Sequence, residues 1–184
     1  KETVCNYERV QAYLDDAGAK LRFVCFADAS KAFERVDPAW IIMVVNSFGV
    51  PQWVTWMLGF LLTSRTSQFR RGQVLGGVIK MACGIDMGAG ASPFLYALAM
   101  DPFLREVKKI PGVKLASAYV DDTAICAEGA EAVGKVMQLF DDYQEISGVL
   151  ISRHECYTAE VPVRVGHGYK LARVAVTGGY DDLA

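Results

Sequence analysis

The stretch Ala116-Ser-Ala-Tyr-Val-Asp121-Asp122-Thr-Ala-Ile-Cys-Ala127 places two adjacent aspartates between two apolar runs. Residues 116–119 and 123–127 have the composition of short strands, so we expect the acidic pair at the turn of a hairpin. Like charges this close repel each other, and an apolar frame tolerates them mainly when a cation or a strong hydrogen-bond donor neutralises them. The pattern therefore predicts a metal site at Asp121 and Asp122.

A third aspartate follows another apolar run. Residues 21–27 have the pattern of a buried strand that ends at Asp28. Two strands that end in acids can bring their carboxylates together at one edge of a sheet. Carboxylate oxygens suit Mg²⁺ and Mn²⁺, which usually bind through one or two carboxylates together with substrate phosphates. We therefore expect phosphoryl transfer with two metal ions that share carboxylate ligands.

Adjacent aspartates also have an ordinary explanation, because charged residues are mostly exposed. Three more pairs occur in the chain: Asp15-Asp16, Asp141-Asp142 and Asp181-Asp182. The first two lie in segments with the composition of a helical surface and the third lies in the tail, so we expect all three to be solvated. The pair at 121 and 122 differs from them because apolar strands frame it.

Three segments of the chain have the content, order and spacing of known sequence motifs. They are Phe26-Ala-Asp28-Ala-Ser30-Lys31-Ala32-Phe33-Glu34-Arg35-Val36, Gly84-Ile-Asp-Met87-Gly88-Ala-Gly90-Ala-Ser92-Pro93 and Tyr119-Val-Asp121-Asp122. With residues 148–152 they cover about Val10 to Cys156, and three ordered matches are far more specific than one. The chain resembles reverse transcriptases, in particular those of non-LTR retrotransposons. The resemblance implies a polymerase palm, an α+β fold with helices packed on one face of an antiparallel sheet.

Matched residue by residue, the resemblance assigns roles to five positions. It implies that Asp28 and Asp121 bind two catalytic Mg²⁺ or Mn²⁺ ions and that Asp122 lies beside the primer end. The backbone carbonyl of Ala29 would complete the shell of one ion. Phe33 takes the place of the aromatic side chain under the sugar of the incoming nucleotide, although a core aromatic after a strand is the alternative on sequence alone.

Two further positions depart from the family pattern. Met87 and Gly88 occupy the nucleotide-binding position of the second motif. Gly88 matches the family's glycine, but Met87 stands where the family normally has glutamine. Glu155 aligns near a lysine that is proposed as general acid, and an ordinary glutamate titrates far below working pH. Two functions therefore stay open. The chain is either an RNA-directed DNA polymerase that extends a primer 3′-hydroxyl, or a degenerate, catalytically inactive retrotransposon remnant with at most weak nucleic-acid binding.

The implied partners are an RNA template, a DNA primer and deoxynucleoside triphosphates, with no membrane and no small-molecule cofactor. An RNA-directed RNA polymerase would share the Asp-Asp hairpin but fits the run from Ser30 to Phe33 poorly. The 19 basic and 21 acidic residues lack the basic excess of most nucleic-acid binders. Local phosphate contacts are expected only from Arg65, Arg70, Arg71, Lys80, Lys108 and Lys109.

Cysteine usage and the N-terminal sequence indicate the compartment. The five cysteines show no Cys-x-x-Cys spacing, and the chain shows no signal peptide. We therefore expect an intracellular protein, nuclear or cytoplasmic and not secreted. Residues 1–156 are expected to form one palm-like domain with fingers and thumb largely missing, and residues 157–184 a diverged tail of uncertain structure.

Periodicity and breakers predict the other elements. A helix is expected over residues 3–17, and tail strands over 162–165 and 169–176. Asp37-Pro38 should begin a helix through residue 48, because Asp is a good N-cap and Pro a good first helical residue. Further helices are expected over residues 51–63, 92–108 and 131–146. A hairpin should lie between the helices at 51–63 and 92–108, and Ser92 should cap the helix at 92–108. Within the helix at 51–63, an apolar stripe at helical spacing is expected to face the core: Trp53, Trp56, Met57 and Phe60.

Overall fold

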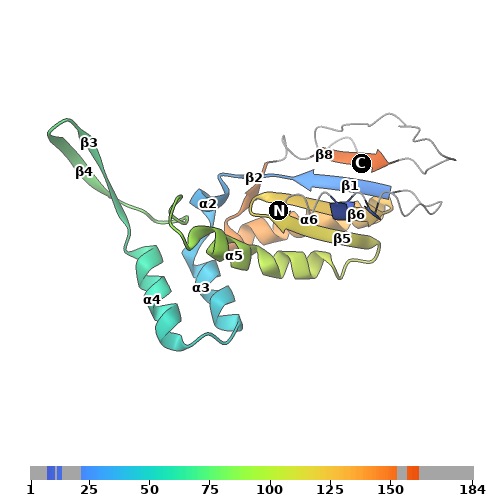
Figure 1. The fold of residues 1–184 in the computed structure, drawn as a ribbon, viewed down its shortest axis with the longest axis horizontal. Helices are drawn as coiled ribbons and strands as arrows, with labels where there is room; N and C mark the ends of the chain where they lie inside the picture. The colour runs from blue at the N-terminus through green and yellow to red at the C-terminus, as the bar shows by residue number, and fades with distance from the viewer. Residues whose placement is uncertain (1–7, 11, 14–21, 153–156, 162–184) are drawn as a thin grey trace.

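Four antiparallel strands form the main sheet, as Figure 1 shows. Their order is β5 (Val113–Tyr119), β6 (Asp122–Glu128), β1 (Arg22–Ala27) and β8 (Tyr157–Val161). The structure is a computed structural model that describes residues 8–10, 12–13, 22–152 and 157–161. β1 is hydrogen-bonded to β6 along one edge and to β8 along the other, and its residues 23–25 are buried. The prediction of a buried strand before Asp28 is confirmed.

Two long helices, α5 (Ser92–Val107) and α6 (Ala130–Ser147), cover one face of this sheet. Phe103 of α5 packs against Phe140 of α6 with ring centroids 4.3 Å apart, and Ile125 of β6 belongs to the same core. Successive strand residues point to opposite faces. Val24 therefore faces the other side, where it packs with Val10 of the helical residues 8–10. The predicted α+β palm architecture is confirmed.

A second layer links the two aspartate-bearing segments to the helices. Residues 29–30 and 150–151 pair as a small sheet, and two helices follow the first of these strands. These elements are β2 (Ala29–Ser30), β7 (Leu150–Ile151), α2 (Ala32–Arg35) and α3 (Pro38–Ser47). Asp37 caps α3 as predicted, since its carboxylate accepts a hydrogen bond from the Ala39 amide at 2.7 Å. The Trp40 indole donates to the Ala99 carbonyl at 3.1 Å and joins α3 to α5.

Helix α4 (Gln52–Thr63) and the hairpin β3 (Thr66–Arg71)–β4 (Val74–Lys80) extend away from the main sheet (Figure 1). The predicted core stripe on α4 is wrong: Trp56 is 82 % exposed, and Trp53, Met57 and Phe60 are exposed as well. α4 instead buries Thr55 and Leu62. The helix is apolar on almost every side and has no charged residue, so periodicity does not identify its inward face.

The ends of the other helices follow the predictions with one exception. Gly148, with φ of +74°, terminates α6, and Gly72, with φ of +63°, forms the bend of the β3–β4 hairpin. Ser92, however, is the first helical residue of α5 and not its cap. Its hydroxyl donates to the Asp86 carbonyl at 2.6 Å, so it is used to hold the preceding loop.

Several predictions lie outside the described residues. They concern Glu155, the strands at 162–165 and 169–176, the aspartate pairs at 15–16 and 181–182, and most of the helix at 3–17, of which residues 8–10 and 12–13 are helical. Of the pair Asp141-Asp142 on α6, Asp142 is exposed as expected, and its carboxylate accepts a hydrogen bond from the Gln138 side chain at 3.0 Å. In the part of the chain that the structure describes, no helix is both long and apolar enough to span a bilayer.

Candidate active site

The turn between β5 and β6 holds the acidic pair in a strained backbone conformation. Tyr119 and Asp122 form the last pair of the ladder, so Val120 and Asp121 make a two-residue turn. Val120 has φ of +56°. A β-branched residue is unfavourable in this left-handed region, at a cost of roughly 1–3 kcal/mol. The Val120 side chain packs on the main core, which helps to hold this geometry. Such strain is typical of functional sites.

Asp28 emerges from the sheet beside this turn. The last pair of the β1–β6 ladder is Ala27 with Thr123, so the next residue of β1 lies next to the hairpin acids. The Asp28 carbonyl accepts a hydrogen bond from the Ser152 amide at 2.9 Å, which fixes its backbone. The strand register therefore places Asp28 beside the turn that carries Asp121 and Asp122. The metal-binding roles of these acids remain predictions.

The buried side chain of Tyr96 reports how these carboxylates are arranged. Burial, the neighbouring Tyr143 and the negative charges of Asp121 and Asp28 raise the pKa of the Tyr96 hydroxyl above its usual range. Both carboxylates therefore lie within electrostatic reach of a single group on α5. Asp28 and Asp121 form what we call the acid pair.

Asp122 lies at the start of β6, directly after the turn. It is exposed and belongs to β6, where strand alternation puts it on the same face as Ala124 and Cys126, opposite the helices. Among the described residues, no three His, Cys, Asp or Glu side chains gather where they could hold a metal ion. The acid pair is thus the candidate cation site. Two carboxylates suit Mg²⁺ or Mn²⁺, which take their other ligands from water and phosphate.

Phe33 belongs to the same motif as Asp28 and contacts Tyr96. The two ring centroids are 5.2 Å apart, and Phe33 is only partly buried against the core. It can therefore pack on the core with one side and offer the other to a ligand. Ala29 is buried in β2, where it pairs with Ile151. The nucleotide-binding roles of Phe33 and Ala29 remain predictions.

The glycine-rich second motif is attached directly to the first motif. The amide of Gly84 donates to the Val36 carbonyl at 2.8 Å, and that of Ile85 donates to the Phe33 carbonyl at 2.5 Å. Gly84 has φ of +85°, and a Cβ there would lie 2.5 Å from the Glu34 carbonyl oxygen. Only glycine permits this close approach. Met87 follows in the same loop and is 69 % exposed.

Gly88 lies at an open position of this loop. Its φ is +87°, and a Cβ added there would meet none of the described residues within 4 Å. Its backbone is therefore accessible to a ligand. The nucleotide-binding roles predicted for Met87 and Gly88 remain predictions.

The prediction that Arg65 contacts phosphate is wrong. Its side chain is only 11 % exposed, and the guanidinium pairs with the Asp86 carboxylate at 2.7 Å. It also donates to the carbonyls of Leu62, Cys83 and Gly84. Arg65 therefore joins the end of α4 to the second motif. Sequence reasoning missed this role, because the second-motif partners of Arg65 lie about twenty positions further along the chain and no local sequence pattern indicates them.

The other basic residues singled out by sequence lie on the surface. Arg70, Arg71 and Lys80 are exposed on the β3–β4 hairpin. Lys108 and Lys109 are exposed at the end of α5, where the Lys109 ammonium pairs with Glu106 at 2.6 Å. All five can reach a solvent-side ligand.

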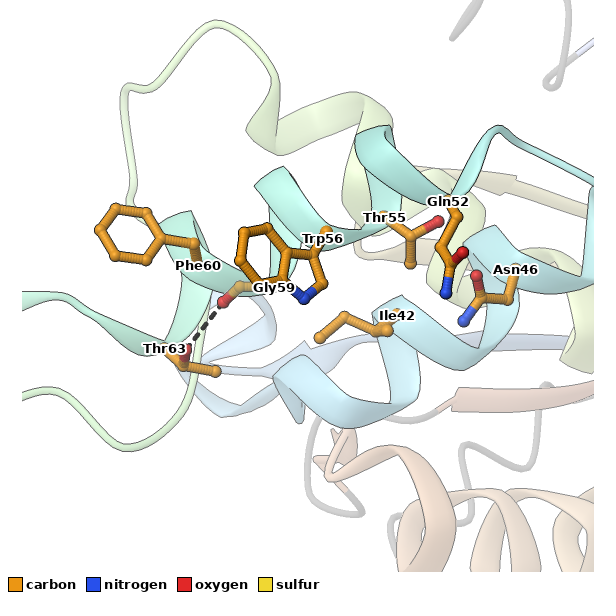
Figure 2. A pocket seen from close by; sticks show the side chains of 8 residues that line it. All are labelled: Ile42, Asn46, Gln52, Thr55, Trp56, Gly59, Phe60 and Thr63. Carbon is orange, nitrogen blue, oxygen red and sulfur yellow. Dashed lines mark hydrogen bonds between the residues drawn. The ribbon is translucent and has the colours of Figure 1, made fainter.

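A cavity of about 530 Å³ lies apart from the acid pair, between α3 and α4. Figure 2 shows Ile42 of α3 opposite Trp56 of α4, with the amides of Asn46 and Gln52 at one end. Its lining contains no predicted site residue. It is a groove beside the exposed stripe of α4 and not part of the candidate active site.

Comparisons with known proteins identify the family. The family profile described as reverse transcriptase (RNA-dependent DNA polymerase) matches residues 3–165. No curated protein shows significant similarity to the chain. Among solved structures, telomerase from Candida tropicalis in complex with a fragment of telomeric RNA aligns with a TM-score of 0.66 and 10 % identity, over 92 % of this chain and 30 % of the telomerase chain.

Two other telomerase structures show the same fold similarity. Apo telomerase from Candida tropicalis aligns with a TM-score of 0.68 and 11 % identity over 83 % of this chain and 31 % of its own. Telomerase from Candida albicans in complex with a fragment of telomeric RNA aligns with a TM-score of 0.66 and 11 % identity, over 91 % of this chain and 34 % of the telomerase chain. The chain thus spans about a third of these proteins, and such low identity shows the fold alone. The family profile, by contrast, covers most of the sequence, and the chain belongs to the reverse transcriptase (RNA-dependent DNA polymerase) family.

Proposed function

We propose that the chain is the palm of a metal-dependent RNA-directed DNA polymerase that adds deoxynucleotides to a primer 3′-hydroxyl. The observation that supports the proposal is the position of Asp28, at the end of the central strand β1, beside the turn that carries Asp121, in a chain of this family. The run from Ser30 to Phe33 supports the non-LTR retrotransposon type.

The chain's own residues would bind and orient the reactants. Asp28 and Asp121 are held at fixed positions by the register of β1 and β6 and would hold two divalent ions, with the Ala29 carbonyl as a further ligand. When bound, Mg²⁺ or Mn²⁺ supplies activation of the attacking hydroxyl and neutralisation of the leaving pyrophosphate. Asp122 would lie beside the primer end. The accessible side of Phe33 would lie under the sugar of the nucleotide and exclude a 2′-hydroxyl by contact.

The proposed partners are an RNA template, a DNA primer and deoxynucleoside triphosphates, inside the cell. The telomerases from Candida tropicalis and Candida albicans, which have this fold, were each solved with a fragment of telomeric RNA. The exposed cations of the β3–β4 hairpin and the exposed Lys108 can approach phosphates.

A second candidate function is that of an inactive relative with weak nucleic-acid binding. The observation that favours it is Met87, which is exposed where the family pattern has glutamine. A thioether cannot donate the hydrogen bonds that an amide offers to a nucleotide. The inactive chain would keep the palm fold and the acid pair without turnover.

Primer extension on an RNA template tests both candidates. The unmodified chain is incubated with a DNA primer, deoxynucleotides and Mg²⁺ or Mn²⁺, beside the variants Asp121→Asn and Asp142→Asn. We expect extension by the unmodified chain and background extension by Asp121→Asn, because the amide removes one anionic ligand. Asp142→Asn is the matched control, because it also alters an adjacent aspartate pair but lies on the exposed face of α6.

The outcomes separate the two functions. Extension that survives Asp121→Asn would refute the assignment of the acid pair. A folded chain that extends no primer, and in which Met87→Gln restores extension, would establish the inactive relative and the reason for its inactivity.

A further inference from the structure

Tyr96 and Tyr143 are both buried in the core beneath the sheet, but their hydroxyl groups differ. The Tyr143 hydroxyl donates a hydrogen bond to the Ala99 carbonyl. The Tyr96 hydroxyl is fully buried, with 0 % exposure of the residue, and has no hydrogen-bond partner among the described residues. A buried polar group without a partner is costly and rare in native proteins, so its retention calls for an explanation.

The position of Tyr96 explains why this hydroxyl is retained. Its ring contacts that of Phe33 and the whole residue is buried, so the hydroxyl does not reach solvent. Val120, the neighbour of Asp121, packs on the core cluster that contains Tyr96, and the charges of Asp121 and Asp28 act on the Tyr96 hydroxyl. Thr123, the register partner of Ala27 next to Asp28, also has a buried hydroxyl without a partner among the described residues. The core beneath the acid pair thus contains hydroxyl donors that are not used internally.

A carboxylate that binds a cation through one oxygen leaves its second oxygen to be satisfied. Metal-binding carboxylates are generally hydrogen-bonded by a neighbouring group, which fixes their orientation and raises metal affinity. A tyrosine hydroxyl suits this purpose, because it donates one hydrogen bond and adds no positive charge that would compete with the cation. A tyrosine hydroxyl is protonated at physiological pH and so stays a donor.

We propose that Tyr96 is a positioning residue whose hydroxyl donates a hydrogen bond to the Asp121 carboxylate when a divalent cation occupies the acid pair. The inference rests on the proposed function, because it requires a cation at Asp28 and Asp121. Tyr96 does not touch the reactants. It would act by holding Asp121 in the orientation that binds the cation.

Tyr96→Phe tests the role, because it removes the hydroxyl and keeps the ring contact with Phe33. Two quantities are measured: the affinity for Mn²⁺ alone, by electron paramagnetic resonance titration, and the melting temperature without metal. We expect Mn²⁺ affinity to fall by about tenfold. The melting temperature should stay the same or rise, because a hydroxyl that lacks a partner is removed. Tyr143→Phe is the matched control: it breaks an existing hydrogen bond, so it should lower the melting temperature and leave Mn²⁺ affinity unchanged.

Asp121→Asn in the same titration separates this inference from the proposed function. If Asp121→Asn weakens Mn²⁺ binding and Tyr96→Phe does not, the positioning role is overturned and the metal site stands. If neither variant weakens Mn²⁺ binding, both the metal site and the positioning role are overturned. A fall in Mn²⁺ affinity with Tyr96→Phe that Tyr143→Phe reproduces would show a general effect of core packing and also overturn the role.

Discussion

At the scale of single residues, Gly84 links the first two motifs of the chain. Its backbone lies against that of Glu34, and its amide donates to Val36, so the loop that carries Met87 and Gly88 is fixed relative to the Asp28 segment. The close approach depends on the absence of a side chain and on a positive φ, both of which glycine allows at low cost.

Gly84→Ala is expected to destabilise the fold by roughly 2–3 kcal/mol, because the new Cβ would meet the Glu34 backbone at 2.5 Å in an unfavourable φ region. The free energy of unfolding is measured by urea denaturation. Gly77→Ala is the control, since Gly77 lies in β4, and a Cβ there would meet none of the described residues within 4 Å. That variant should be neutral or stabilising by up to about 1 kcal/mol. Equal effects of the two substitutions would contradict the contact between the motifs.

At the scale of elements, the register between β1 and β6 sets Asp28 beside the turn that carries Asp121 and Asp122. A slip by one residue would turn every side chain of the strand to the other face. The apolar residues buried on both faces, such as Val24 on one and Ile125 on the other, resist that slip. The acid pair is therefore held by packing of the two central strands.

Helices α3 and α4 show how differently two tryptophans contribute to one structure. Trp40 of α3 is 7 % exposed, donates to the Ala99 carbonyl and meets the Tyr143 ring edge-on at 5.7 Å. Trp56 of α4 belongs to the exposed stripe. A contiguous exposed apolar patch marks an interaction surface or an aggregation site.

Trp40→Ala should lower the free energy of unfolding by roughly 3–5 kcal/mol, as expected for a buried aromatic residue. Trp56→Ala should change it by less than about 1 kcal/mol, because little of its surface leaves water on folding. Chemical denaturation of both variants measures the difference. A loss at Trp56 as large as that at Trp40 would show that this helix face is covered, as its periodicity first suggested.

At the scale of the whole molecule, the sheet shields its central cysteines while a loop cysteine stays accessible. Cys126 of β6 is completely buried, and burial together with the neighbouring Cys25 raises the pKa of its thiol to about 12. Cys83 lies exposed in the loop before the second motif. Because the thiolate is the reactive form, a raised pKa lowers the reactive fraction of Cys126 at pH 8.

Alkylation at pH 8 should therefore modify Cys83 quickly and Cys126 at least about a thousandfold more slowly, because the second reaction requires opening of the sheet. Residue-resolved mass spectrometry measures both rates. Added urea should bring them together as the chain unfolds. Comparable rates without denaturant would mean that the central strands open freely, against the packing described for β1 and β6.

The amino-acid sequence alone determined the acidic hairpin, the strand before Asp28, the capped start of α3 and the palm architecture. These features depend on local patterns, such as an apolar run that ends in an acid or an Asp-Pro helix start.

The tertiary structure decided which groups work together. The α4 stripe is exposed because α4 buries a different set of residues. The Arg65 guanidinium is paired because a loop about twenty positions away offers its carbonyls. Tyr96 packs in one core with residues of β1 and β6, which come from distant parts of the chain. The physical reason is that burial and hydrogen-bond partners are properties of the space around a side chain, and neighbours distant in sequence fill that space.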